Sequence, residues 1–140
     1  MTDAHGDLQR RCNTIEEGYE FMLAYAAQGL AGDAGSQSGG QLREFLTRAA
    51  AALTGIGDVF AALIDAAPLE PAARYRAYRA VLDRDARDSL AAVELVLAQP
   101  SISSQLIDNL NASIHLRALL TDLFLIDELL KSQSAATHNG

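Results

Sequence analysis

The chain has 140 residues, which is enough for one domain with its own hydrophobic core and without disulfides or metal to hold it together. Hydrophobic residues make up 49% of it and alanine is the commonest of them, while aromatic residues are only 6% and Trp is absent, which excludes the usual composition of a β-sandwich or barrel and favours an all-α fold. The formal net charge of −7 at pH 7 excludes a basic surface for nucleic acid.

The number of cysteines and the length of the apolar stretches indicate the cell compartment in which the protein works. The single cysteine, Cys12, cannot form an intramolecular disulfide, and residues 1–6 contain no apolar stretch of the signal-peptide type. The apolar stretches are interrupted by acidic residues before they reach the ~20 residues that span a bilayer. We therefore expect a cytoplasmic protein with no membrane contact, and the alanine- and arginine-rich usage suggests a bacterial source.

The first predicted element is an amphipathic helix that begins at Thr14, because Thr14 and Glu17 fit a capping box, and that ends near Gly29. Residues 1–13 before it read as a flexible tail. A Gly- and Ser-rich stretch, residues 32–40, follows as a loop.

The second predicted helix carries apolar residues at three- and four-residue spacing from Leu42 to Leu63 and ends before Pro68. Gly55 and Gly57 interrupt it, and each glycine inside a helix costs roughly 1 kcal/mol relative to alanine. We interpret the pair as a place where another helix packs closely, with a local break as the alternative.

The third and fourth predicted helices are the longest. The third begins at Pro71, a residue suited to a first helical turn, and ends near Ala98. The fourth reads as one unbroken helix from Ser101 to Gln133, and residues 134–140 read as a second flexible tail. Residues 14–133 are thus expected to form one four-helix, mostly antiparallel bundle with a long fourth helix.

The second half of the fourth helix is apolar on almost every side, which is typical of a central or interface helix. The short first helix cannot cover its full length, so we expect a contiguous apolar patch and a homodimer formed through it. The alternative is that the second and third helices cover this surface. The candidate interface residues are Leu119, Leu123, Ile126 and Leu130.

A polar candidate site lies upstream on the same helix. His115 is the one histidine outside the predicted tails, and Asp108 and Asn111 precede it by whole helical turns, so the three are expected on one face. They would form a polar rim around an interface or a small-ligand pocket. The alternative is a partly buried His115 that is hydrogen-bonded to Asn111 or to a helix carbonyl. No Glu-x-x-His pair of the di-iron type occurs, so no metal is expected.

The segment Ser113-Ile114-His115-Leu116-Arg117-Ala118 is loosely similar to histidine phosphotransfer sites, which present a histidine halfway along a helix of a four-helix bundle. The register differs: Arg117 comes two positions after His115, whereas that family places its basic residue three positions after the histidine and then a glycine. The resemblance implies that His115 is a phosphoryl acceptor.

No other chemistry is indicated by spacing. There is no phosphate-binding loop with its lysine and no serine–histidine–aspartate signature, so no cofactor and no catalytic residue are expected. We expect a small cytoplasmic accessory or regulatory protein that binds another protein through a helical surface. The alternatives are a phosphotransfer domain with His115 as acceptor and a bundle that binds a small apolar ligand.

Overall fold

The computed structural model describes residues 3–67 and 69–139, and within these residues it contains six α-helices and no β-strand. The helices are α1 (Ala4–Ala27), α2 (Gln37–Leu53), α3 (Ile56–Ala66), α4 (Ala72–Leu97), α5 (Ser104–Ala112) and α6 (Ile114–Asn139). The expected all-α class is confirmed. The predicted count of four helices is not, because the second and the fourth predicted helices are each divided in two.

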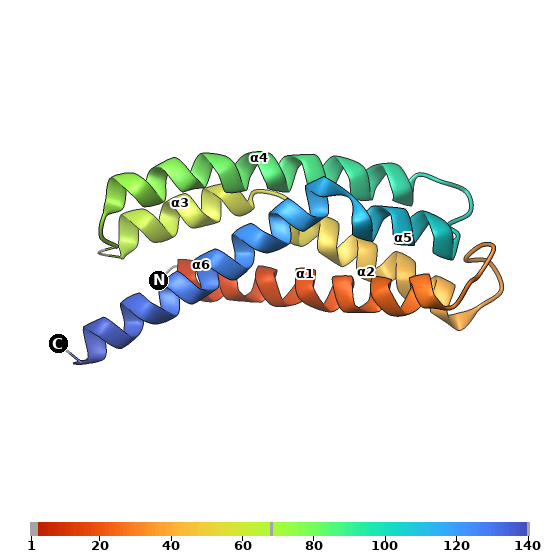
Figure 1. The fold of residues 1–140 in the computed structure, drawn as a ribbon, viewed down its shortest axis with the longest axis horizontal. Helices are drawn as coiled ribbons and strands as arrows, with labels where there is room; N and C mark the ends of the chain where they lie inside the picture. Colours follow the sequence, from red (N-terminus) through yellow and green to blue (C-terminus); the bar gives the residue numbers. More distant parts are fainter. Residues whose placement is uncertain (1–2, 68, 140) are drawn as a thin grey trace.

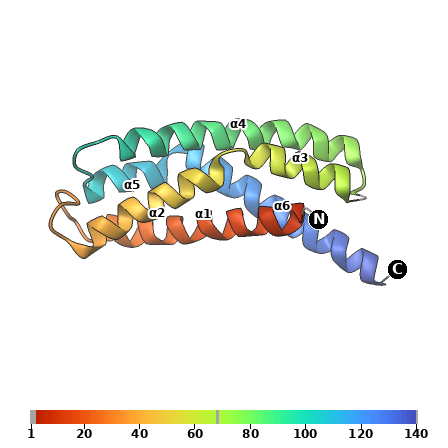
Figure 2. The same cartoon turned by 180° about the vertical axis from the view of Figure 1, so that it is seen from behind.

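The helices form an elongated bundle (Figure 1). Helices α1 and α4 run along its length, α1 packs against α2 and α5, and α4 packs against α3 and α6. Helix α6 crosses the bundle obliquely, and its last turns extend past the start of α1 at one end of the molecule. Figure 2 shows the same extension from behind. The arrangement leaves one side of α6 without a neighbouring helix.

Helix α1 begins ten residues earlier than the capping box at Thr14 suggests. The Asp3 carboxylate accepts a hydrogen bond from the Gly6 amide and caps the helix there. Leu8 and Cys12 are buried in the core, so residues 4–13 are helical and not the expected flexible tail. At the other end, residues 134–139 continue α6, and Gly140 lies outside the described residues.

The glycine pair in the second predicted helix serves two purposes. Gly55 has φ +77°, a left-handed conformation that separates α2 from α3, so the break treated as the alternative does occur. Gly57 allows close packing instead: a Cβ there would lie 2.9 Å from the Cβ of Asp83 on α4. The guanidinium of Arg11 donates to the carbonyl oxygens of Ala52 and Thr54, which the break leaves without helical partners.

The fourth predicted helix breaks at Ser113, so the expected unbroken helix is wrong. Ser113 has extended backbone angles (φ −62°, ψ 144°), and its hydroxyl accepts the Leu116 amide proton at 3.3 Å. A serine hydroxyl competes with helix hydrogen bonds and favours caps, which is the physical reason for the break. Ser89 on α4 then donates to the carbonyl of His115 at 2.9 Å and fixes the start of α6.

The end of the bundle opposite the α6 extension is fixed by polar contacts to loop backbone. The Tyr25 hydroxyl donates to the Ile102 carbonyl at 2.7 Å, and the Ser104 hydroxyl donates to the Tyr25 carbonyl at 2.6 Å. Arg43 on α2 binds the Asp33 carboxylate and donates to two backbone carbonyls at the end of α4. These contacts join the loops before α2 and α5 to the helices around them.

Within the described residues, no single helix is long and apolar enough to cross a membrane. Helices α2 and α3 meet the length and hydropathy criteria only as a pair bent by 44°. Five of their large apolar side chains are 0–3% exposed in the core of the bundle: Leu42, Leu46, Leu53, Ile56 and Phe60. Core packing accounts for the apolar character of this pair.

Replacing Arg43 with Met should lower the free energy of unfolding by about 1–3 kcal/mol, because Asp33, only 10% exposed, and two backbone carbonyls would lose their donors. The matched control is Arg48→Met on the same helix, whose ion pair with Glu44 is exposed and should contribute less than about 1 kcal/mol. Urea denaturation of both variants measures the difference. Equal losses would show that the Arg43 contacts do not stabilise the fold.

A candidate binding groove between α4 and α6

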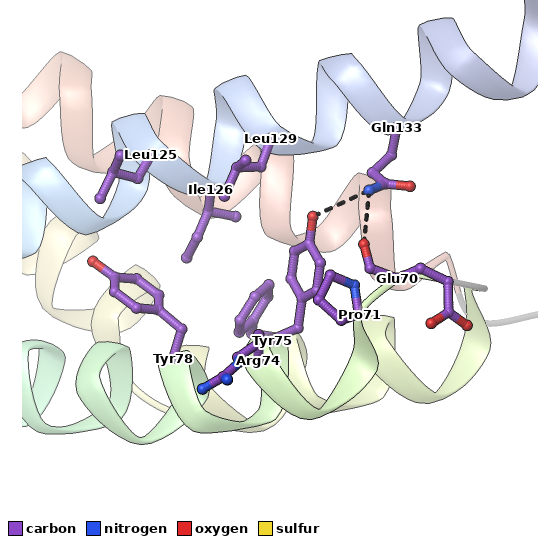
Figure 3. A pocket seen from close by; sticks show the side chains of 10 residues that line it. Glu70, Pro71, Arg74, Tyr75, Tyr78, Leu125, Ile126, Leu129 and Gln133 are labelled. Carbon is purple, nitrogen blue, oxygen red and sulfur yellow. Dashed lines mark hydrogen bonds between the residues drawn. The ribbon is translucent and has the colours of Figure 1, made fainter.

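A groove with a volume of about 380 Å³ opens between the beginning of α4 and the second half of α6 (Figure 3). Its size lies in the range of small-molecule and peptide side-chain sites. Its walls are mainly aromatic and aliphatic. The lining residues are Phe60, Glu70, Pro71, Arg74, Tyr75, Tyr78, Leu125, Ile126, Leu129 and Gln133.

Helical spacing brings the groove's walls together. Tyr75 and Tyr78 lie one turn apart on α4, and Leu125 and Leu129 lie one turn apart on α6. Phe60 on α3 lies below them, with its ring 6.5 Å from that of Tyr75 and inclined by 56°. The two leucines are 48% and 47% exposed, which is unusual for large apolar side chains beside a cavity. The groove is therefore open, apolar and unfilled by the chain's own side chains.

Polar groups lie at the rim of the groove. The Gln133 side-chain amide donates to the Glu70 carbonyl at 3.2 Å and to the Tyr75 hydroxyl at 3.5 Å, which joins the end of α6 to the start of α4 (Figure 3). Arg74 is exposed and forms no ion pair within the described residues. The rim thus offers two exposed charged side chains, Arg74 and Glu70, beside an apolar floor, and a charged rim around an apolar centre is usual in protein interfaces.

A buried carboxyl lies next to the groove. Asp122 on α6 is 3% exposed, and its Oδ1 accepts a hydrogen bond from the Tyr78 hydroxyl. No N–H or O–H group of the described residues donates to its Oδ2, and the carboxyl of Asp85 on α4 is its other neighbour. Two carboxyls in such contact favour a shared proton over two negative charges.

The electrostatics of this cluster follow from burial. Desolvation, and then the contact with Asp85, raise the pKa of Asp122 to about 7, against the lowering effect of the Tyr78 hydroxyl. Desolvation and the bond to Asp122 raise the pKa of Tyr78 above its ordinary value. The carboxyl of Asp122 is therefore partly protonated near neutral pH. The cluster is thus a contact between α4 and α6 that depends on protonation. The described residues contain no group of three or more His, Cys, Asp or Glu side chains that could hold a metal ion.

The expected interface residues mostly face inward. Leu119, Leu123 and Ile126 are 0–2% exposed in the core of the single chain, and Leu130 is half-buried. They are covered because α1 is longer than predicted and α6 crosses the bundle obliquely instead of extending along it. The large apolar side chains of α6 that one chain leaves exposed, beyond the first turn, are Phe124, Leu125 and Leu129. The expected apolar surface exists, but on a different face of the helix.

The residues of the predicted polar site lie on two helices and differ in exposure. The break at Ser113 places Asp108 and Asn111 on α5 and His115 on α6. Asp108 and His115 are exposed, whereas Asn111 is 7% exposed and neither atom of its side-chain amide has a hydrogen-bond partner among the described residues. Exposure of His115 meets one requirement of a phosphoryl acceptor, but it lies in the first turn of α6 and not halfway along a long helix.

Sequence reasoning missed the partners of Asp122. Asp122 is an acid inside an apolar segment, which is a signal of a buried polar contact. Its partners Tyr78 and Asp85 lie on another helix, and no periodicity within one helix can identify them. For Cys12, burial, and then the charges of Glu16 and Asp127, raise the pKa of the thiol to about 12, which disfavours the reactive thiolate.

No protein-family model, no curated protein and no solved structure matches the chain. The groove therefore has to be interpreted from its own geometry and chemistry. Its apolar walls, its open side and the cation at its rim suit recognition of another molecule. Nothing in the lining supplies a nucleophile paired with a base.

Replacing Asp122 with Asn should remove a pH dependence of stability. The pKa of Asp122 is higher in the folded than in the unfolded chain. The stability that the protonated carboxyl contributes is therefore fully present below about pH 4 and is lost as the pH rises through about 7. Asn keeps the neutral hydrogen-bonding shape at every pH. Between pH 5 and pH 8, the free energy of unfolding of the variant should therefore rise by roughly 1–3 kcal/mol relative to that of the wild type.

Urea denaturation across this pH range measures the gain. The matched control is Asp88→Asn on the exposed side of α4, which should leave the difference from wild type constant with pH. A second variant, Asp85→Asn, should reduce the pH dependence without removing it, because the burial of Asp122 remains. A stability difference for Asp122→Asn that does not change with pH would contradict a shared proton.

Proposed function

We propose that the chain is a small cytoplasmic accessory or regulatory protein that binds another protein in the groove between α4 and α6. The observation that carries this proposal is the pair Leu125 and Leu129, each nearly half exposed beside an aromatic-walled cavity. Exposed apolar surface of this kind normally marks an interaction site. The lining lacks an activated nucleophile or a metal site, so binding is favoured over catalysis.

The groove's shape favours an amphipathic helix as the bound element. Its two walls are helices, and each wall presents its large side chains one turn apart, which matches a partner helix with anchors at i and i+4. Arg74 at the rim favours an acidic residue beside those anchors. A partner helix with two large apolar residues and a flanking Asp or Glu fits the groove chemically.

A small apolar ligand is the second candidate for the same groove. The volume of about 380 Å³ suits a molecule of modest size, and Tyr75 and Gln133 offer polar atoms at one end. Native mass spectrometry of the purified chain distinguishes the two candidates, because a bound small molecule adds a discrete mass. The phosphotransfer alternative rests on the exposure of His115 alone.

Replacing Leu129 with Asp should abolish partner binding through the groove, because a carboxylate placed among apolar walls costs several kcal/mol when a partner removes its water. Leu129 is 47% exposed, so the free energy of unfolding should change by less than about 1 kcal/mol. Affinity capture from the native cell extract, compared between wild type and variant, measures the effect.

The matched control is Leu95→Asp, since Leu95 is an exposed leucine on α4 that does not line the groove. It should retain the partner that Leu129→Asp loses. The proposal fails if both variants retain the same stoichiometric partner, or if both lose it while remaining folded.

A further inference from the structure

The groove and a helix able to fill it lie on the same chain. Leu125 and Leu129 form one wall of the groove and also project from α6 as two apolar anchors one turn apart. These are the anchors that the proposed function requires of a partner helix. A two-fold symmetric interface needs a surface that carries both the receiving groove and the inserted side chains, and this surface does.

The position of α6 leaves these anchors accessible to a second molecule. Helix α6 crosses the bundle and its last turns extend beyond the start of α1, in both views of the molecule (Figures 1 and 2). On one side of α6, Leu123 and Ile126 pack into the chain's own core and are only 1–2% exposed. The side of Leu125 and Leu129 faces outward beside the groove.

Charges at the groove are complementary between two copies. Arg74 on the α4 rim and Glu128 on α6 are both exposed, and neither forms an ion pair within the described residues. Glu128 lies within one helical turn of both leucine anchors, so we expect a second α6 in the groove to bring its Glu128 toward the rim, where Arg74 and Glu70 both lie. The pairing occurs twice in a symmetric dimer.

We propose that, when no other partner is bound, the groove holds α6 of a second copy of this chain, with the two α6 helices antiparallel across a two-fold axis. Leu125 and Leu129 of each copy enter the groove of the other, and Arg74 of each copy pairs with the Glu128 of the other. This inference rests on the proposed function of the groove as a helix-binding site. A partner protein then competes with the second copy for one surface.

The test measures self-association of the full chain by sedimentation equilibrium. Because each interface is confined to one groove, we expect a reversible dimer with a Kd on the order of micromolar. Arg74→Glu and Glu128→Arg should each raise the Kd about 10-fold or more, since each places two like charges opposite each other twice per dimer. The double variant R74E/E128R should return the Kd to within about 3-fold of the wild type, because the pairs are restored with reversed signs.

The matched control is Arg84→Glu, which changes another exposed arginine of α4 that forms no ion pair within the described residues and lies outside the groove. It should leave the Kd unchanged. All three positions are exposed, so circular dichroism should show the same fold in all four variants. Rescue by the double variant is a result that a general loss of stability cannot produce.

Two outcomes overturn the inference. A chain that stays monomeric at millimolar concentration excludes the symmetric dimer, and a dimer that is insensitive to both single charge reversals places the interface elsewhere. Neither outcome touches the proposed function if Leu129→Asp still abolishes capture of a partner that Leu95→Asp retains. If the dimer forms as described and no groove-dependent partner exists, self-association stands while the proposed function fails.

Discussion

The turn at Ser113 is the constraint on which the shape of this protein depends. A hydroxyl that caps Leu116 ends one helix and begins the next, so α6 leaves the direction of α5 and crosses the bundle obliquely. The bond from Ser89 to the carbonyl of His115 fixes where that crossing starts. The crossing lets one face of α6 pack into the core while the next face remains open beside α4. The groove is a direct consequence of this change in direction.

The contact between α4 and α6 combines apolar packing with a pair of carboxyls, Asp85 and Asp122, neither of which forms an ion pair within the described residues. Burying Asp122 beside Asp85 is costly unless a proton is shared, and the Tyr78 hydroxyl satisfies only one oxygen. Tyr78 also lines the groove, so the protonation of this cluster and the position of the groove wall involve the same side chain. An apolar side chain at position 122 would pack without this dependence on pH, which makes the acid the least expected residue of the α6 core.

Helix α6 has two apolar faces with different roles. One, which includes Leu119, Leu123 and Ile126, holds the chain together, and the other, with Leu125 and Leu129, lies at the surface. A helix that only served folding would place polar residues on its second face. The presence of leucines there, beside tyrosine-lined walls and an arginine that forms no ion pair within the described residues, is the physical basis for the binding function proposed above.

Composition and periodicity alone determined the all-α class and the approximate position of the long apolar segments, because these depend on local spacing. The sequence could not decide where three helices begin or end. A cap at Thr14 competes with the cap at Asp3, and a continuous helix competes with the breaks at Gly55 and Ser113. Only packing decides between these alternatives. The angle at which α4 and α6 cross decides which leucines of α6 are buried. The same angle brings Tyr78 and Asp85 into contact with Asp122. That angle is a property of the folded chain, so only the tertiary structure could separate the core face of α6 from the face that forms the groove.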